Sequence, residues 1–212
     1  MKKISMLLLL ISFVCIQTRQ MTVDMHMLFR SLQCDYFQGL FIEDRQHTLM
    51  SMQASDFYQI NKERMLFLEQ KYADLLHKNV VASVSVQWIN SVVGYGLFAL
   101  EALPKDSFIG EYAGRLKVIK KSEAYNYSYA WKYPLGETDE VMMIVDAKNL
   151  GNELRFVNHS VDCNVKVVYV TGYDRRIHVC FIALKDIVKG QQLLIHYGSI
   201  NWGDKEPSVL HP

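Results

Sequence analysis

The spacing of apolar residues along the chain changes once, near residue 80. Before that point, five apolar positions fall near helical spacing: Leu28, Leu32, Phe37, Leu40 and Phe41. Residues 64–76 mix charges with apolar positions three and four residues apart, which is typical of an amphipathic helix. Residues 21–79 contain no proline and a single glycine. We therefore predict helices up to Asn79, with Asn61 as the N-cap of the last one and Asn79 as its C-terminal stop.

After residue 80, short runs of β-branched and aromatic residues alternate with turn residues. The runs cover residues 80–88, 96–100, 108–112, 141–145, 165–170, 177–182 and 193–197. Strands that follow one another without long helices between them argue against a doubly wound parallel sheet. The predicted fold class is α+β, with a helical N-terminal region (1–79), a β-rich domain (80–198) and a short tail (199–212).

Composition and charge narrow the possible functions. A length of 212 residues suits one domain with an appendage, and half of the residues are hydrophobic, which excludes a disordered chain. The net charge of +1 provides no positive field for nucleic acid, so we expect no direct nucleic-acid partner. The four cysteines form no C-x-x-C pair, which predicts free thiols and no metal site.

The N-terminus has features of a secretory signal, because Lys2 and Lys3 precede a mostly apolar stretch over residues 4–16. The stretch is too short to span a bilayer, and residues 17–20 contain no small-x-small cleavage site. A cleaved signal and a retained apolar helix both remain open, and we favour the retained helix. We expect no stable insertion into a membrane.

Several motifs follow one another in a fixed order. Taken alone, Gly94-Tyr95-Gly96 predicts only a tight turn, and it lacks the third glycine of a dinucleotide-binding loop. It is followed by motifs at residues 109–114, 127–131, 146–152, 155–160 and 193–198. Within the fourth, Arg155-Phe156-Val157-Asn158-His159-Ser160 precedes by about 38 residues an apolar strand that ends in Tyr197-Gly198.

This series resembles the SET-domain protein methyltransferases over about residues 84–198. Within that family it looks most like the short SET proteins of chlamydia-like intracellular bacteria, in which a helical extension precedes the domain. The resemblance implies small sheets and a pseudoknot, in which the strand with Asn158-His159-Ser160 and the segment after Tyr197 thread together.

The resemblance also implies a cofactor, S-adenosylmethionine, and a set of site residues. The residues expected on the cofactor side are Gly94, Tyr95, Gly96, Asn158 and His159, with Arg155 and Phe156 in support. Tyr197 is expected where the methyl group is transferred, and Tyr112 and Tyr129 are expected to line the channel for a substrate lysine. Trp202 either stacks on the adenine or caps the core.

Elementary chemistry agrees with these roles. Methyl transfer needs a neutral amine, yet near pH 7 the lysine ammonium is favoured by about 4.6 kcal/mol. A dry aromatic channel disfavours the ammonium and aligns the nitrogen, so it supplies part of this free energy without a dedicated base. The carboxamide of Asn158 can donate to a carboxylate and accept from an amine, both of which the cofactor carries.

Some positions depart from the family pattern, and the substrate stays open. Many SET enzymes have a zinc-binding cysteine after Asn-His-Ser, but this chain has Val161 there and no cysteine in residues 198–212, so no zinc is expected. The expected partner is a lysine-rich protein such as a histone or a bacterial histone-like protein. Methylation of a ribosomal or other non-histone protein, and a non-catalytic SET module that binds a protein, are the alternatives.

The assembly and the location are also expectations. The apolar residues 4–16 and the helices up to Asn79 need a covering surface, which predicts a homodimer. Because the periplasm would lack the cofactor, we expect a protein of the bacterial cytoplasm, or a bacterial effector delivered into a host cell, including its nucleus.

Overall fold

The computed structural model describes residues 25–42 and 55–197, which fall into two compact units divided after Tyr36. In the first unit, residues 25–31 are helical and the short strand β1 (Asp35–Tyr36) follows. The ring of Phe29 meets that of Tyr36 edge-on, with the centroids 5.1 Å apart. No helix in the described parts of the chain is long and apolar enough to cross a membrane.

The long helix of the second unit, α2 (Asp56–His77), begins and ends with local capping contacts. The backbone N–H of Tyr58 donates to Ser55 Oγ at 3.2 Å, so Ser55 is the N-cap. The prediction of Asn61 as N-cap is wrong, because Asn61 lies inside the helix and donates to the Phe57 carbonyl. At the other end Asn79 has a φ of 49°, a left-handed conformation that asparagine tolerates, so the helix stops where predicted.

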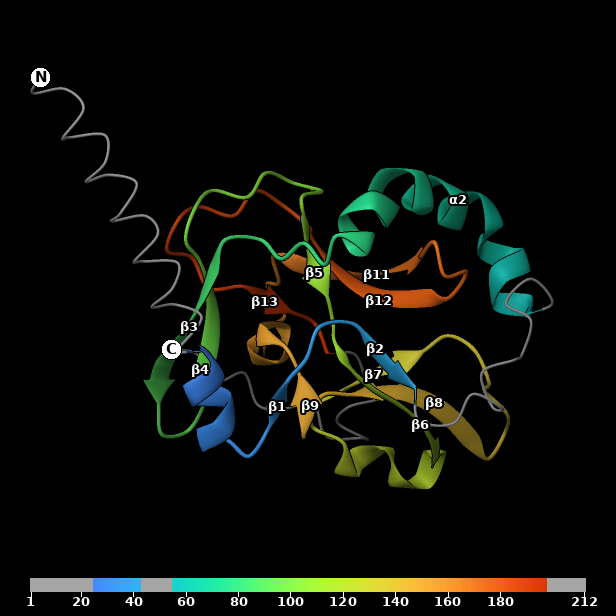
Figure 1. The fold of residues 1–212 in the computed structure, drawn as a ribbon, viewed down its shortest axis with the longest axis horizontal. Helices are drawn as coiled ribbons and strands as arrows, with labels where there is room; N and C mark the ends of the chain where they lie inside the picture. The colour runs from blue at the N-terminus through green and yellow to red at the C-terminus, as the bar shows by residue number, and fades with distance from the viewer. Residues whose placement is uncertain (1–24, 43–54, 198–212) are drawn as a thin grey trace, which may run out of the picture. The chain divides into compact units, whose positions relative to one another are not determined.

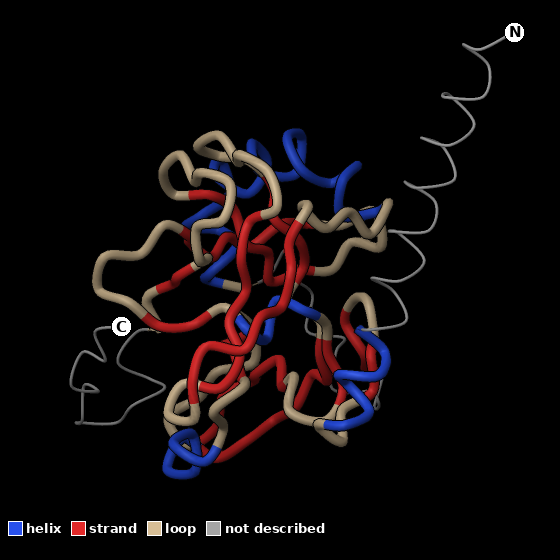
Figure 2. The backbone as a smooth tube through the Cα atoms, turned by 90° about the vertical axis from the view of Figure 1, so that its left-hand side faces the viewer, coloured by secondary structure: helices blue, strands red, loops and turns tan. Residues whose placement is uncertain are grey.

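Helix α2 lies across strands β11 (Val165–Thr171) and β12 (Ile177–Ala183), as Figures 1 and 2 show. The buried residues of this cluster are Leu68, Tyr72, Leu76, Phe108, Val168, Val170, Cys180 and Ile182. Tyr72 also donates its hydroxyl to the Asp106 carbonyl at 2.8 Å. This cluster fixes the helical part of the second unit to its main sheet.

The strands of the second unit form several small sheets, as predicted (Figure 1). One sheet has the order β10 (Asn158–His159), β13 (Leu194–Ile195), β11, β12 and β5 (Phe108–Glu111). A second has the order β2 (Leu40–Ile42), β6 (Gly114–Lys120), β8 (Val141–Asp146) and β7 (Ala130–Tyr133), and a hairpin joins β3 (Val84–Asn90) to β4 (Gly94–Ala99). The short strand β9 (Leu150–Gly151) and the 3-10 helices η3 (Lys121–Asn126) and η4 (Glu153–Phe156) complete the unit.

Residues 37–42 correct the sequence-based prediction of a helix. Leu40 and Phe41 belong to β2, which pairs in parallel with β6 from Leu40 opposite Gly114 to Ile42 opposite Leu116. Gly39 has a φ of 102°, a conformation that ends any helical run before this strand. The partner strand lies more than seventy residues away, so local spacing could not reveal the pairing.

The parallel pairing of β10 with β13 brings the two sequence motifs together. Asn158 lies opposite Leu194 and His159 opposite Ile195, and β13 also pairs with β11 at Val165. The N–H of Ser160 extends the contact to the Ile195 carbonyl at 3.1 Å. The segment after Tyr197, which the predicted pseudoknot requires, lies outside the described residues.

Candidate active site

A narrow cavity opens where several of the predicted site residues meet. Its walls come from the residue after β5, the start of β7, η4 with the residue after it, and the second residue after β13: Tyr112, Ser128, Ala130, Trp131, Leu154, Arg155, Val157 and Tyr197. Its volume is about 10 Å³, which is room for one water-sized group. The predicted residues Tyr112 and Tyr197 are thus brought together from positions far apart in the sequence.

Both tyrosine hydroxyls are anchored to backbone carbonyls. Tyr112 donates to the Tyr129 carbonyl and Tyr197 donates to the Val157 carbonyl, each at 2.8 Å. Burial raises the pKa of Tyr112 and of Tyr197 well above the ordinary value for a phenol. Each therefore stays neutral near pH 7 and can position a reacting amine but cannot act as a general base.

Trp131, which was not among the predicted site residues, lines this cavity. Its ring meets Tyr112 at 6.2 Å, Tyr197 at 6.1 Å and Phe181 at 5.5 Å between centroids, each time edge to face. Tyr112, Trp131 and Tyr197 thus form the aromatic part of the cavity wall, and Phe181 packs against Trp131. Its position in the tyrosine-rich motif at residues 127–131 was the available signal.

Tyr129, predicted to line the channel with its ring, contributes in another way. Its side chain is 37% exposed and lies under the guanidinium of Arg155, with 4.2 Å from Arg155 Cζ to the ring centroid. Its ring does not belong to the cavity wall, whereas its carbonyl holds the Tyr112 hydroxyl. The structure therefore gives Tyr129 a positioning contact beside the cavity.

The glycine turn and Asn158 form a second cluster beside the cavity. Asn158 Nδ2 donates to the Tyr95 carbonyl at 3.0 Å, which ties β10 to the start of β4. Gly94 has a φ of 77°, and a Cβ built there would meet nothing within 4 Å, so the backbone is open to a ligand at this point. A Cβ on Gly96 would instead come within 2.6 Å of Gln192 Nε2 and Ile89 Cδ1, so the ends of these two side chains would have to shift.

His159 links this cluster to the cavity. Its Nδ1 accepts a hydrogen bond from the backbone N–H of Tyr197 at 3.1 Å. Its ring also lies 5.4 Å from that of Tyr197 and 5.1 Å from that of His196. Because Nδ1 is the acceptor in this contact, the imidazole fixes the backbone of Tyr197 relative to β10.

Arg155 and Phe156 lie in η4, between the cavity and the glycine turn. Arg155 is buried and donates to the carbonyls of Ala147 at 3.0 Å and Lys148 at 3.1 Å. Phe156 meets Tyr95 with 5.9 Å between ring centroids. Both residues therefore brace the surroundings of the site.

Some predicted features fall outside this arrangement. Trp202 lies outside the described residues, as does Cys15. Cys163 and Cys180 are free thiols, and the thiol of Cys34 donates to the Asp35 carbonyl at 3.7 Å. Within the described ranges, no three His, Cys, Asp or Glu residues gather in a group that could hold a metal ion.

Together these residues form an aromatic cavity next to a backbone turn that is open on one side. The donor set fits S-adenosylmethionine, because an open turn with a positive φ and a carboxamide can receive its polar end, while the cavity can receive an alkyl amine. The arrangement can therefore align an amine with a methyl donor in a water-poor space.

Comparison with known proteins identifies the family that this part of the chain matches. The family described as SET domain matches residues 94–198. Histone-lysine N-methyltransferase EZH2 of Chaetomium thermophilum is 30% identical over 61% of this chain and 10% of its own length. The H3 lysine-9 specific histone-lysine N-methyltransferase SUVH5 of Arabidopsis thaliana is 36% identical over 49% of this chain and 13% of its own length. The chain thus spans only about a tenth of the curated relatives that it matches.

One solved structure shows a similar fold. ATXR5 in complex with histone H3.1 mono-methylated on R26 matches with a TM-score of 0.63 and 21% identity, over 84% of this chain and 86% of that chain. A structure of ctPRC2 holds S-adenosylmethionine; it is 25% identical over 66% of this chain and 19% of that chain, with a TM-score of 0.48. Residues 94–198 therefore match the SET domain, and the chain is related in sequence to histone-lysine N-methyltransferases.

Proposed function

We propose that this chain is an S-adenosylmethionine-dependent protein-lysine N-methyltransferase that acts on the tail of a histone or a histone-like protein. The observation that carries the proposal is the aromatic cavity of Tyr112, Trp131 and Tyr197, joined through His159 to the Asn158 and Gly94 cluster. The relatives' names as histone-lysine N-methyltransferases support the histone part of it.

In this proposal the cofactor supplies an electrophilic methyl group on a sulfonium sulfur. The lysine nitrogen must reach it neutral, and the buried aromatic walls favour the neutral amine because they exclude water. The anchored hydroxyls of Tyr112 and Tyr197 keep the walls in place while the amine is aligned. A C–S bond breaks, an N–C bond forms, and the lysine proton leaves to solvent.

The Asn158 and Gly94 cluster is proposed to hold the cofactor. One N–H of the Asn158 side-chain amide already donates to the Tyr95 carbonyl. The other N–H and the side-chain oxygen of Asn158 can therefore bind the ligand. Gly94 lets the ligand approach the backbone closely. Arg155, Phe156 and His159 keep the surrounding segments in place, and Trp202 keeps its two expected roles, on the adenine or on the core.

The proposal is tested by incubating the purified chain with methyl-labelled S-adenosylmethionine and a set of basic proteins. Core histones, a bacterial histone-like protein and ribosomal proteins would be offered separately, and the modified residue would be mapped by mass spectrometry. Transfer to lysine in a histone supports the proposal. Transfer only to a ribosomal protein would replace the substrate class, and cofactor binding without any transfer would favour a non-catalytic binding module.

Location and assembly form part of the same proposal. The reaction needs a compartment that contains S-adenosylmethionine, which is the bacterial cytoplasm or, for an exported effector, the host cell and its nucleus. A homodimer is proposed because α2 exposes apolar side chains, including Ile60 at 82% and Phe67 at 59%.

A further inference from the structure

A second cavity has a volume of about 280 Å³, and one of its lining residues directly precedes a lining residue of the first cavity. Tyr112 lines the narrow first cavity, and its neighbour Glu111, the last residue of β5, lines the second. The other walls come from residues 37–40, from the last turn of α2 and from the turn at residues 172–174. No step of the proposed methyl transfer uses this space.

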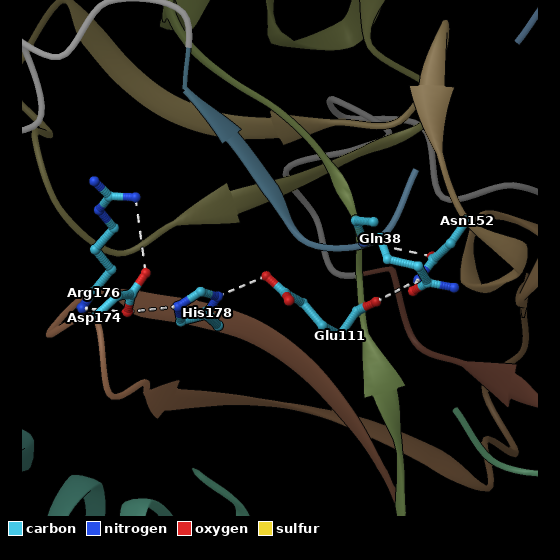
Figure 3. A network of polar contacts seen from close by, with 7 residues as sticks. Gln38, Glu111, Asn152, Asp174, Arg176 and His178 are labelled. Atoms are coloured by element: carbon cyan, nitrogen blue, oxygen red, sulfur yellow. Dashed lines mark hydrogen bonds and ion pairs between the residues drawn. The ribbon is translucent and has the colours of Figure 1, made fainter. Parts of the chain in front are cut away.

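The base of the second cavity carries a chain of charges, drawn in Figure 3. Glu111 Oε1 lies 2.6 Å from His178 Nδ1, and His178 Nε2 lies 3.1 Å from Asp174 Oδ1. Burial by itself would lower the pKa of His178, but the hydrogen bonds to Asp174 and Glu111 outweigh it and raise this pKa to about 9. At neutral pH the three groups are two carboxylates and one imidazolium, so their sum is one negative charge.

One carboxylate oxygen of this group lacks a partner. The Glu111 side chain is only 9% exposed, yet its Oε2 accepts no hydrogen bond from any part of the chain that the structure describes. Asn152 Nδ2 donates to the Glu111 backbone carbonyl instead, at 2.8 Å (Figure 3). Oε2 lies on the side of Gly39, where an added Cβ would be 3.8 Å from it. A buried carboxylate oxygen left unpaired is costly, so it is a strong attractor for a cation.

The neighbouring groups also favour a cation. Asp74 accepts from the Tyr173 hydroxyl at the rim, and the Tyr173 ring lies 5.3 Å from that of His77. Arg176 is the nearby countercharge, at 3.8 Å from Asp174 Oδ2, but both side chains are more than two-fifths exposed and water screens the pair. The cavity is also formed at the C-terminal end of α2, which is the negative end of the helix dipole.

We propose that this second cavity binds a small organic cation, an alkylammonium or alkylguanidinium group, with its head on Glu111 Oε2 and its aliphatic stem between Leu40 and Leu76. The volume is just below the usual range for drug-sized ligands, so it fits a ligand the size of a lysine or arginine side chain. The same chemistry is presented by a free amine or by a basic side chain of a protein.

The test is a titration of the full, ¹⁵N-labelled chain followed by NMR, without cofactor or protein substrate. Butylguanidinium is the main probe, because its planar head group is too wide for the narrow lysine channel. The expected result is saturable shifts at the amides of Gly39, Gly172 and Asp174, with none at Trp131. Butanol, which has the same stem without the charge, serves as the control and should leave these amides unchanged.

Two variants separate binding from general damage. Glu111→Gln should weaken butylguanidinium binding at least about tenfold, since it removes the charged acceptor. Leu40→Trp keeps every charge and fills the cavity, and it should also abolish binding, so the test stands even if Glu111→Gln fails to fold. An acetylated arginine methylamide and an arginine-containing peptide show whether the source is a free cation or a protein side chain. The proposal is overturned if both variants show the same saturable shifts as the unmodified chain, or if the unmodified chain shows no saturable shifts.

Discussion

Adjacent residues of the chain line two different cavities in this protein. Tyr112, which directly follows β5, lines the narrow aromatic cavity, and Glu111, the last residue of β5, lines the larger charged one. The motif at residues 127–131 predicted the wall of the narrow cavity only in part. The motif located the wall of the channel, but only the packing of Arg155 on Tyr129 shows that Trp131, and not Tyr129, supplies the ring.

At the residue scale, replacing Tyr197 by phenylalanine separates chemistry from binding. The variant keeps the ring but leaves the Val157 carbonyl without its partner, so the alignment of the amine is lost. We expect methyl transfer to fall by about ten- to a hundredfold while the affinity for S-adenosylmethionine changes less than about twofold. Single-turnover kinetics and calorimetry measure the two quantities.

A matched control for this variant is Tyr169→Phe. Tyr169 also donates its hydroxyl to a backbone carbonyl, that of Lys132 at 3.0 Å, but it does not line the channel. Its removal should leave the rate within about twofold. Equal rate losses in the two variants would mean that Tyr197 acts only through stability.

Asn158→Ala should produce the opposite pattern. The substitution removes the carboxamide proposed to bind the cofactor and also its hydrogen bond to Tyr95. The loss of about 1–2 kcal/mol of hydrogen bonding predicts about ten-fold weaker binding of S-adenosylmethionine by calorimetry. Unchanged cofactor affinity in a folded Asn158→Ala protein would remove Asn158 from the proposed cofactor site.

The raised pKa of His178 predicts how the free energy of unfolding depends on pH. Its pKa is raised from an ordinary value of 6.5 to about 9, so the stabilisation is fully present below pH 6.5 and is lost as the pH rises towards 9. The shift corresponds to an order of magnitude of about 3 kcal/mol. Urea denaturation at pH 6 and pH 9 should show this loss, and Glu111→Gln should make it smaller. A free energy of unfolding that is constant over this range contradicts the prediction.

At the scale of elements, runs of β-branched and aromatic residues predicted β4, β5, β8, β11 and β12 to within about two residues. They missed β6 and β7, and the segment before α2 was assigned incorrectly. Leu40 and Phe41 have helical spacing, yet their parallel pairing with β6 decides their conformation. The N-cap was also misplaced, because Asn61 and Ser55 are both good capping residues and only the structure shows which one meets a free N–H. The local spacing of apolar residues therefore cannot predict which strands pair or which residue caps a helix.

The packing of α2 on the main sheet can be tested with one substitution at two positions. Leu68 is 7% exposed within the core cluster, whereas Leu66 on the same helix is 42% exposed. Leu68→Ala should lower the free energy of unfolding by about 2–4 kcal/mol, through lost burial and a cavity, and Leu66→Ala by less than about 1 kcal/mol. Chemical denaturation followed by circular dichroism gives both values. Similar losses would mean that α2 does not pack on β11 as described.

At the scale of the whole molecule, exposed apolar side chains on α2 predict a homodimer. Ile60 and Phe67 lie seven residues apart on α2, on one face of the helix, and both are exposed. We expect the full chain to be a dimer by light scattering at micromolar concentration, and Ile60→Lys to shift it towards monomer. Val188→Lys, at a position 64% exposed elsewhere, is the control and should leave the dimer intact. A monomeric mass for the unmodified chain contradicts the prediction.

The central claim is that the cavity of Tyr112, Trp131 and Tyr197 aligns a lysine amine for methyl transfer. The most direct measurement is the mass of a histone H3 tail peptide after incubation with the chain and S-adenosylmethionine, with fragmentation to locate the added methyl group. The account predicts an added methyl mass on a lysine side chain, which accumulates about ten- to a hundredfold more slowly with Tyr197→Phe and within about twofold of the unmodified rate with Tyr169→Phe. Transfer to arginine instead of lysine, or lysine methylation that persists in Tyr197→Phe at the unmodified rate, would contradict it.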